Sequence, residues 1–375
     1  MLDAGAPWRR EPGYYHLSAE GHMRLGQKSW IRALAVVALT LPCSALLSSL
    51  RALEAGAGTA QAQPGPPQAP TVQCNLRGQV VLSASTTIVD AQGQPIARFS
   101  GAPTPLVASD FPADAQGRAR VETGFGAGAF RIRGFLDVSQ LPLFTATNVA
   151  IASGHLWIAE GRSVTLVGAA AGRLRVEKKL VSPLQQTVRA EGSCHSFSLE
   201  PQVPSGFSPA AGARGYQLKR ESLDLYGDPA SEAPIATLHR APNVDALLFY
   251  GTEQQNGSVH LQYHAEIIVD AWAKLSALSP LPAGELVDQV APAVTHHNVP
   301  QLTFQTPPKL VRPTREVALH RTAKDSDPKI GVIEPGAETY VLDQVAGWAN
   351  VLPKSMNVMP AGDGQFWAKS SDLGL

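Results

Sequence analysis

The stretch IEPGAETYVLDQVAGWANVLPKSMNVMPAGDGQFWAKSSDL, residues 333–373, carries the pattern from which the fold can be predicted. Ile333 and Gly336 open it, an alternating run follows, and Gly347 begins the segment GWANV eleven residues after Gly336. Alternating apolar and polar side chains are typical of a half-buried β-strand, and glycine turns between such runs indicate hairpins. The stretch ends on WAKSSDL, which we interpret as a closing strand with its Trp packed inward.

The same pattern recurs upstream, which predicts a repeat protein. In residues 156–199, Ile158 and Gly161 repeat the Ile-x-x-Gly pair, and Gly172 follows eleven residues later. Three upstream regions carry segments that match GWANV and WAKSSDL. They are GRLRV (172–176) with SCHSFSL (193–199), GSVHL (257–261) with WAKLSAL (272–278), and GRARV (117–121) with FLDVSQL (135–141). We therefore expect copy one at 63–142, copy two at 143–203, copy three at 216–280 and copy four at 310–375, copies one and three being the more divergent.

Each copy predicts a small barrel. About five short strands fit in each, and closing the sheet removes the exposed edges that such short strands would leave. The predicted fold class is therefore all-β: tandem small barrels, each a closed five-stranded sheet, joined by Pro/Gly-rich linkers such as 281–309. The expected boundaries lie near residues 142, 205 and 300.

The pattern of copy four resembles bacterial SH3-like (SH3b) domains. The residues that carry the resemblance are Ile333, Gly336, Val341, Gly347, Trp348, Val351, Trp367 and Leu373. It covers residues 312–375 and extends to 143–200, where Arg173 and Ser193 replace the two Trp residues. The resemblance implies a β-barrel adaptor of the cell envelope that binds peptides or a glycan-peptide polymer, beside cell-wall hydrolases or in sensing proteins.

Residues 1–62 are interpreted as an export segment with its start at Met23. Three basic residues between 24 and 32 precede the uncharged, mostly apolar run 33–50, which is the order found in a signal peptide. Ala60-Gln61-Ala62 offers a cleavage site. Two alternatives stay open: the run 33–50 as a single-span membrane anchor, and lipidation at Cys43. The expected location is periplasmic or extracellular in a bacterium.

Charge and cysteine content restrict the partners. The 31 basic and 31 acidic side chains balance, so no overall field attracts nucleic acid or an anionic membrane. If Cys43 leaves with the signal, Cys74 and Cys194 remain and form a disulfide in an oxidising compartment. The alternative is two unpaired thiols. Because no Cys-x-x-Cys spacing is present, the sequence does not predict a zinc site.

Catalytic and metal motifs are absent from the sequence, so we expect no enzyme activity and no cofactor. Gly-x-Ser-x-Gly, His-Glu-x-x-His and phosphate-binding glycine loops do not occur. The weaker candidates all have ordinary interpretations as strand, turn or linker residues. They are His260 with His264, the adjacent His296 and His297, Cys194 with His195, and Ser326 with Lys329.

The predicted ligand contacts are Trp348 and Tyr340, which alternation places on the outer face of a small barrel, while core packing is the alternative for Trp348. Alternating arginines at 118, 120, 173 and 175 are a second candidate, for an anion. The sequence thus predicts an exported noncatalytic adaptor or envelope-binding protein whose partner is peptidoglycan or an envelope protein. A membrane-tethered sensor ectodomain is the alternative. An envelope hydrolase would require a deep polar pocket at His195 or His264.

Overall fold

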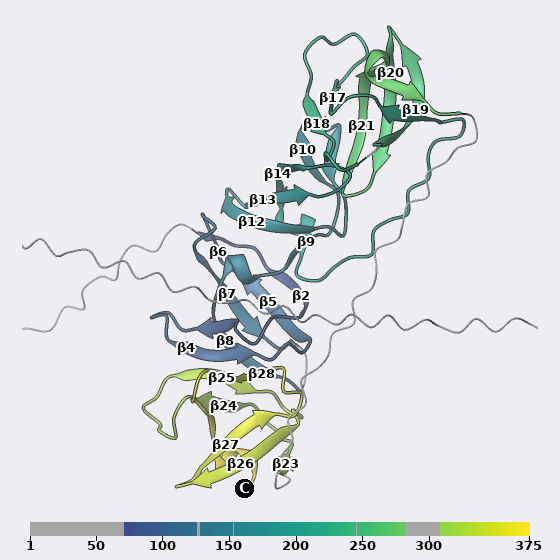
Figure 1. Cartoon of the computed structure of the whole chain (residues 1–375). Coiled ribbons are helices and arrows are strands. Elements are labelled where there is room, and N and C mark those ends of the chain that lie inside the picture. Colours follow the sequence, from purple (N-terminus) through teal and green to yellow (C-terminus); the bar gives the residue numbers. More distant parts are fainter. Residues whose placement is uncertain (1–70, 126–127, 153, 245, 283–307) are drawn as a thin grey trace, which may run out of the picture. The chain divides into compact units, whose positions relative to one another are not determined.

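The computed structural model describes residues 71–125, 128–152, 154–244, 246–282 and 308–375, all within one compact unit that spans Pro64–Leu375. The predicted export segment 1–62 and most of the linker 281–309 lie outside the described residues. The regular structure is β-strand, with single turns of 3-10 helix (Figure 1). The prediction of an all-β protein is therefore confirmed.

The four copies share one plan: a first strand, a short hairpin, a long hairpin, a strand that pairs with the long hairpin and is called its third strand, and a 3-10 turn. In copy one these are β2 (Leu76–Val80), β3 (Thr87–Val89) and β4 (Pro95–Phe99), β5 (Thr104–Ser109) and β7 (Arg118–Thr123), β8 (Phe130–Asp137) and η1 (Val138–Gln140). In copy two they are β9 (Leu143–Thr145), β10 (Val149–Ala152) and β11 (Leu156–Ile158), β12 (Ser163–Ala170) and β13 (Arg173–Leu180), β14 (Gln186–Ser193) and η2 (Cys194–Ser196).

Copies three and four follow the same plan. Copy three has β16 (Arg214–Leu218), β17 (Ser222–Leu225) and β18 (Ala236–His239), β19 (Leu248–Gln255) and β20 (Ser258–His264), β21 (Ile267–Lys274) and η3 (Leu275–Ala277). Copy four has β23 (Lys309–Val311), β24 (Val317–His320) and β25 (Lys329–Ile333), β26 (Thr339–Val345) and β27 (Trp348–Pro353), β29 (Phe366–Lys369) and η4 (Ser370–Leu373). The further strands are β1 (Thr71–Val72), β6 (Phe111–Pro112), β15 (Phe197–Ser198), β22 (Leu278–Pro280) and β28 (Val358–Pro360).

Strand order is the same in every copy. First strand, long hairpin and third strand are neighbours in the orders β2-β5-β7-β8, β9-β12-β13-β14, β16-β19-β20-β21 and β23-β26-β27-β29. In copies two and three the strand after the 3-10 turn, β15 or β22, pairs with the first strand. The repeat that short sequence motifs indicated is thus also a repeat of strand order.

The long hairpins of copies two to four repeat at the level of single residues. Both central turn residues have positive φ, as in type I′ turns, at Ala171-Gly172, Asn256-Gly257 and Ala346-Gly347. A β-bulge leaves Val167, Thr252 and Leu342 unpaired, each five residues before its turn glycine. Glycine suits the second central position because other residues adopt positive φ at a cost, which Ala171 and Ala346 bear at the first.

The 3-10 turns fix the alignment of the closing segments. The residue before the turn pairs with the residue after the hairpin glycine in all copies: Asp137 with Arg118, Ser193 with Arg173, Lys274 with Ser258, and Lys369 with Trp348. Copy two is therefore shifted by two residues from the alignment that the sequence suggested: Ser193, and not His195, corresponds to Lys369.

The side-chain orientation that we expected in the two WAK segments is wrong. Ala273 and Ala368 are fully buried, whereas Trp272 and Trp367 are half-buried on the opposite face. Since side chains alternate along a strand, the alanine that enters the core forces both neighbours outward. The Lys residue of each segment is on that outer face as well.

The expected closed five-stranded sheet in each copy is not found. None of the described sheets closes into a barrel: a 13-stranded sheet takes strands from copies one and four, and a 7-stranded sheet from copies two and three. The 5-stranded sheet β14-β13-β12-β9-β15 stays within copy two, and the two-stranded sheets β1-β6 and β17-β18 stay within copies one and three. Sheets extend between copies because the second strand of a short hairpin pairs with the third strand of another copy.

Copies one and four form a first pair, and copies three and two form a second pair. Copy three takes the place of copy one, and copy two that of copy four. Strand β25 of copy four joins β8 of copy one with Ile333 opposite Phe130, and β11 of copy two joins β21 of copy three with Ile158 opposite Ile267. In both, the Ile of Ile-x-x-Gly faces the first residue of the third strand. A contact in the opposite direction also recurs. The short hairpin of copy one pairs through β4 with β28 of copy four, and Arg240, which follows the short hairpin of copy three, forms a bridge with Leu184 of copy two.

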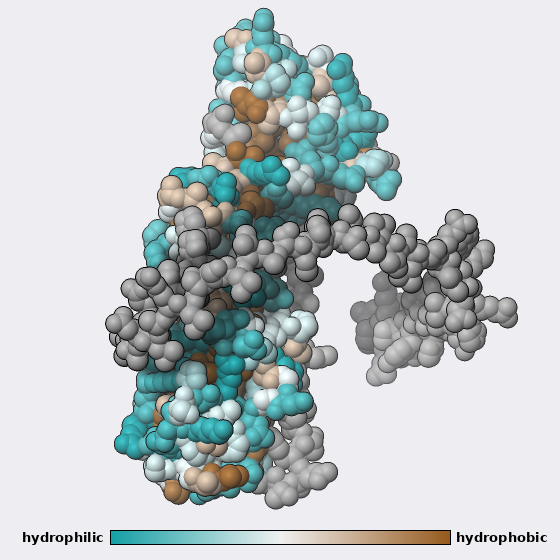
Figure 2. Space-filling model, turned by 90° about the vertical axis from the view of Figure 1, so that its left-hand side faces the viewer, coloured by the Kyte–Doolittle hydropathy of each residue, from teal (hydrophilic) through white to brown (hydrophobic). Residues whose placement is uncertain are grey.

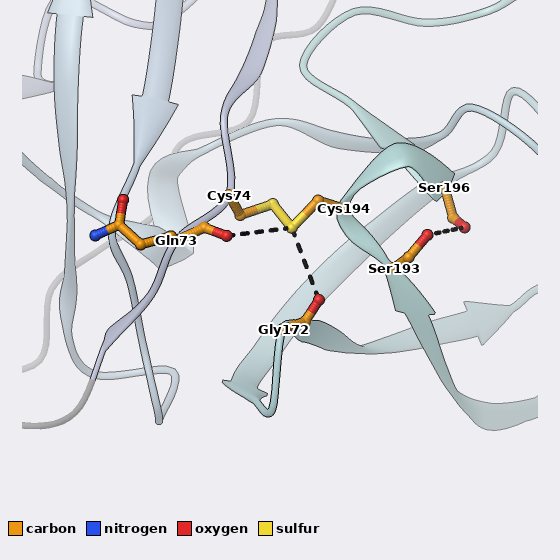
Figure 3. Close-up of a disulfide and its surroundings, with 6 residues drawn as sticks. All are labelled: Gln73, Cys74, Gly172, Ser193, Cys194 and Ser196. Atoms are coloured by element: carbon orange, nitrogen blue, oxygen red, sulfur yellow. Dashed lines mark hydrogen bonds between the residues drawn. A yellow bond between two sulfur atoms is a disulfide. The ribbon is translucent and has the colours of Figure 1, made fainter.

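A disulfide links the two pairs. Cys74, just before β2 of copy one, is joined to Cys194 in η2 of copy two, with 5.6 Å between their Cα atoms (Figure 3). The same two copies are also joined by a hydrogen bond, in which the Gln79 N–H donates to Glu200 Oε2 at 2.7 Å. The cysteines paired in the sequence analysis thus crosslink copies one and two.

Apolar side chains are buried between the sheets, and the fully buried set includes Phe99, Phe111, Phe249 and Phe366. On the side shown in Figure 2, hydrophilic side chains cover most of the described surface and hydrophobic ones appear in small groups.

Candidate anion-binding site

A hollow of about 730 Å³ lies on the outer face of β7 and β8 of copy one, beside β25 of copy four. Cations outnumber carboxylates among its lining side chains. The cations are Arg77, Arg120, Arg131, Arg133, Arg321 and Lys329, and the carboxylates are Asp90, Glu122 and Glu334. We call this surface the arginine hollow.

Strand alternation places the arginines there. On β8, Phe130 and Ile132 are buried, so Arg131 and Arg133 project from the other face. On β7, buried Val121 puts Arg120 on that same outer face. The arginine hollow is thus formed by the polar positions of strands whose apolar positions build the core.

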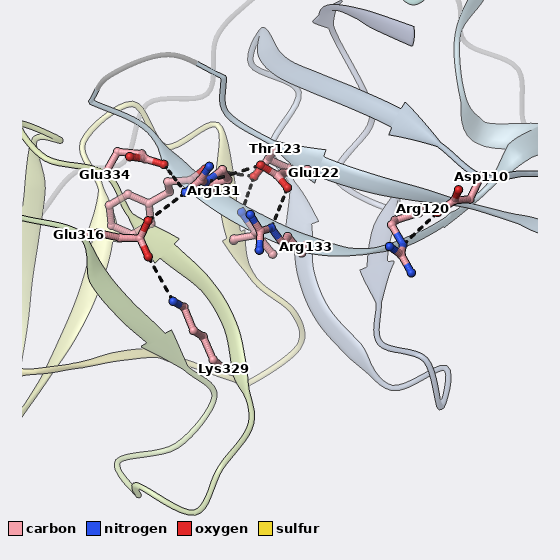
Figure 4. A network of polar contacts seen from close by, with 11 residues as sticks. Asp110, Arg120, Glu122, Thr123, Arg131, Arg133, Glu316, Lys329 and Glu334 are labelled. Carbon is pink, nitrogen blue, oxygen red and sulfur yellow. Dashed lines mark hydrogen bonds and ion pairs between the residues drawn. The ribbon is translucent and has the colours of Figure 1, made fainter. Parts of the chain in front are cut away.

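Arg131 is a structural member of this surface. Its Nη2 lies 2.6 Å from Glu334 Oε1 and 3.0 Å from Glu316 Oε2, both in copy four, and its Nε lies 3.5 Å from Glu122 Oε1 (Figure 4). Lys329 Nζ contacts Glu316 at 3.2 Å. Because three carboxylates surround one half-buried guanidinium, Arg131 holds copy four against copy one and has little charge left for a ligand.

Asp90 and Arg321 form a second ion pair between the same copies. Burial pushes the pKa of Asp90 upward, but hydrogen bonds from Arg321 and the backbone N–H groups of Gln94 and Gln92, with the charge of Arg321, outweigh it. The net pKa is lower than that of an ordinary aspartate. The carboxylate of Asp90 is therefore ionised and committed to Arg321.

Three arginines remain for a ligand. Arg77 is exposed and has no ion-pair partner among the described residues. Arg120 and Arg133 are 63% and 64% exposed, although Arg120 lies 3.2 Å from Asp110 and Arg133 lies 2.7 Å from Glu122. Exposed ion pairs of this kind contribute little free energy, so an incoming carboxylate can exchange with them.

Two of the three arginines, Arg77 and Arg133, lie in one row across the sheet, and Arg120 lies beside this row, opposite Phe135. Arg77 lies opposite Val107, Val107 opposite Glu122, and Glu122 opposite Arg133. Three inter-strand steps of roughly 4.8 Å separate Arg77 from Arg133 by about 14 Å. This spacing fits an extended ligand with more than one carboxylate better than a single small anion.

Apolar contact is available at the edge of the arginine hollow. Phe125 follows β7, lines the hollow and is 42% exposed. An exposed aromatic ring beside cations is common in binding surfaces, since it adds apolar contact to charge recognition. The arginine hollow can therefore bind a chain that carries both carboxylates and apolar groups.

The structure does not bring Trp348 and Tyr340 into one site. Tyr340 is half-buried and lies opposite Leu352, which is four residues, or about 13 Å, along β27 from Trp348. Trp348 is only 7% exposed, because the His320 ring packs edge-on at 5.2 Å and Lys369 Nζ lies 5.8 Å from its ring centre. Of the two alternatives for Trp348, the packed one agrees with this burial, and the ligand-binding role of both residues stays a prediction.

The other sequence candidates are dispersed. Of the four alternating arginines, Arg120 alone lines the arginine hollow; Arg118 pairs with Asp137 and Arg173 with Glu191, while Arg175 donates to the Ala113 carbonyl. In the described part of the chain, no three His, Cys, Asp or Glu side chains gather as metal ligands. His296 and His297 lie outside it.

Sequence reasoning missed most of the site. Arg131 and Arg133 alternate within FRIRGFLD just as Arg118 and Arg120 do in GRARV, and that similarity was the available signal. Arg321 and Lys329 had no signal, because they reach the hollow through a pairing with a distant copy.

No protein-family profile, curated protein or solved structure is detectably similar to this chain. In the residues that the structure describes, no helix is long and apolar enough to span a membrane. The predicted segment 33–50 is not among them.

Proposed function

We propose that this chain is an exported, noncatalytic envelope-binding protein built of four divergent SH3-like modules. The repeated strand order, bulge, turn and 3-10 segment support modules of common origin. Pairing of modules through their short hairpins, in place of separate closed barrels, creates surfaces to which two copies contribute. The arginine hollow is one of these surfaces.

The ligand that fits the arginine hollow is an extended chain with several carboxylates, and the peptide part of peptidoglycan has this chemistry. The observation that carries the proposal is the line of exposed arginines, Arg77 and Arg133 in one row with Arg120 beside them. Charge-assisted bonds from arginine to carboxylate are the strongest polar contacts such a surface can offer. An acidic segment of an envelope protein is the alternative ligand.

Export is supported by the basic and apolar order of residues 24–50 and by the disulfide, which persists in oxidising compartments. A membrane-tethered sensor ectodomain is the alternative function. N-terminal sequencing of the protein from its natural host separates the two, since a start near Gln63 supports secretion and a start at Met23 supports the anchor.

Retention of residues 64–375 on purified peptidoglycan at low salt tests the binding proposal. The informative variant is Arg77→Glu with Arg133→Glu. Its control is Arg189→Glu, because Arg189 is also exposed and forms an ion pair at 2.6 Å with Glu177 on the neighbouring strand. We expect the double variant to lose retention on peptidoglycan and the control to keep it. Equal retention of both variants would reject the arginine hollow as the binding site.

Trp348→Ala belongs in the same experiment. If retention falls with this variant and not with the arginine variant, the ligand contacts copy four at Trp348 instead. Loss of retention in both would require a folding check by circular dichroism, because Trp348 is largely buried.

A further inference from the structure

The second pair contains a smaller hollow at the position that corresponds to the arginine hollow. Its volume is about 200 Å³, and it lies over β20 and β21 of copy three beside β11 of copy two. Pockets for drug-sized ligands start at roughly 300 Å³, so this one suits a single ring of a larger molecule.

Corresponding positions carry different chemistry in the two hollows. Counted back from the 3-10 turn, Asp270 takes the place of Arg133 and Ile268 that of Arg131. Gln262 lies opposite Asp270 as Glu122 lies opposite Arg133. Two arginines of the first pair are thus replaced by a carboxylate and an apolar side chain, and the carboxylate of Glu122 is replaced by an amide.

Aromatic rings form the walls of the second hollow. Trp157 extends from β11 and is half-buried, and Phe207 reaches over from the segment between copies two and three. The Phe207 ring is held in place by the His264 ring, edge-on at 5.2 Å, and by the Tyr250 ring at 5.9 Å. Fixed aromatic walls bind flat apolar faces without a large loss of side-chain entropy.

Planar polar groups complete the lining. Asn148 Oδ1 accepts the Glu160 N–H at 3.0 Å, which leaves its amide N–H groups for a ligand. Asp270 Oδ1 is buried 3.0 Å from His260 Nε2 without a well-directed hydrogen bond, while the side chain as a whole is 47% exposed and can accept through its other oxygen. Together with Gln262, these side chains offer both donors and acceptors around the rings.

The charge of the surroundings favours a neutral ligand. Asp270 opposes an anion. Burial and the negative charge of Glu266 raise the pKa of Tyr263 to about 12, while the positive charge of Arg162 counteracts them. Burial and Arg162 lower the pKa of His264, so charges of both signs surround the hollow. Neither a carboxylate nor an ammonium group is therefore preferred.

We infer that this second hollow, formed by Trp157, Phe207, Asn148, Gln262 and Asp270, binds one ring of a neutral sugar chain. A pyranose has an apolar C–H face that stacks on an aromatic ring, and hydroxyls at its edge that bond to planar amides and carboxylates. The hollow presents both features at the size of one ring. The inference goes beyond the proposed function, and the site lies on other copies than the arginine hollow.

Tryptophan fluorescence and amide NMR of residues 64–375 titrated with neutral tetrasaccharides test the inference. The probes are cellotetraose, maltotetraose and the β-1,4-linked tetramer of N-acetylglucosamine. Binding of at least one at millimolar concentration, with amide shifts on β11, β20 and β21, is the expected result. No binding of any of the three, or shifts confined to other strands, would overturn it.

Variants decide which residues carry the contact. We expect Phe207→Ala and Asp270→Asn each to weaken binding about tenfold, in line with the loss of one stacking or hydrogen-bonding contact. Phe207 lies outside any strand and Asp270→Asn keeps its shape, so both are expected to fold. Unchanged affinity in both would reject the site.

The arginine variant separates this inference from the proposed function. Arg77→Glu with Arg133→Glu is expected to leave sugar affinity unchanged, and Asp270→Asn to leave retention of a carboxylate-bearing chain at the arginine hollow unchanged. Loss of sugar binding in the arginine variant would place the sugar in the first pair and so contradict the inference.

Discussion

Ile333 of copy four lies directly opposite Phe130 of copy one, although 203 positions separate them in the sequence. The same contact joins Ile158 to Ile267 in the second pair. Two equivalent contacts in one register show that pairing is part of the repeat.

Substituting Gly331 with Val is expected to separate copy four from copy one. A Cβ atom at this position would lie 2.3 Å from the Arg131 carbonyl oxygen, so β25 could not stay paired with β8. Overpacking of this kind costs about 1–3 kcal/mol. Urea unfolding should show the loss, while Gly206→Ala, where no atom lies within 4 Å, should leave stability unchanged. Equal stability of both variants would contradict the pairing.

Acid is expected to weaken the first pair through Asp90. A carboxyl whose pKa is lower in the folded state contributes stability above its unfolded pKa of about 3.9, and this is lost as pH falls through the folded value. The stability difference between the wild-type chain and Asp90→Asn should therefore be largest at neutral pH and shrink below about pH 4. A difference that is constant with pH would show that Asp90 is not coupled to Arg321.

Removal of the disulfide is expected to lower the melting temperature. Cys74 and Cys194 are 120 residues apart, and closing a loop of this length stabilises by roughly 4–5 kcal/mol on the chain-entropy model. Calorimetry of Cys74→Ala with Cys194→Ala, against the oxidised wild-type chain, measures the effect. If the melting temperature did not change, the link between the two pairs would have no part in stability.

The hairpin turns allow a reciprocal test. Ala346 adopts a φ of 50° in copy four at the position where copy three has Asn256, also with φ 50°. Asn tolerates this conformation better than Ala, so Ala346→Asn should stabilise by about 0.5–1 kcal/mol and Asn256→Ala should destabilise by a similar amount. Chemical unfolding of both variants checks the pair, and effects of the same sign would contradict the common turn.

Local features of the fold could be predicted from the sequence, but the pairing of strands from different copies could not. Alternation and glycine spacing identified strands, hairpins and the repeat, because they depend on neighbouring residues such as Gly347 and Trp348. Which strand completes each sheet depends instead on contacts such as Ile333 with Phe130, for which a single sequence gives no signal. The closed barrels were therefore wrong although the repeat was found.

For the candidate site, too, the sequence predicted local features and not the contacts between distant residues. Alternating arginines were noticed at Arg118 and Arg120, and alternation alone could not show that Asp137 neutralises the first while the second faces a hollow. An exposed Trp348 was one of two alternatives, because alternation says only which face a side chain occupies. It does not say what covers that face, and here His320 and Lys369 do so.

The most direct test of the account is an amide NMR titration of residues 64–375 with soluble peptidoglycan fragments that keep their free peptide carboxylates. We predict shifts at Arg77, Arg120 and Arg133 that weaken as salt is added, because charge recognition is screened. Shifts centred on Trp348 and Tyr340, or no shifts at low salt, would contradict the claim that the arginine hollow is the ligand site.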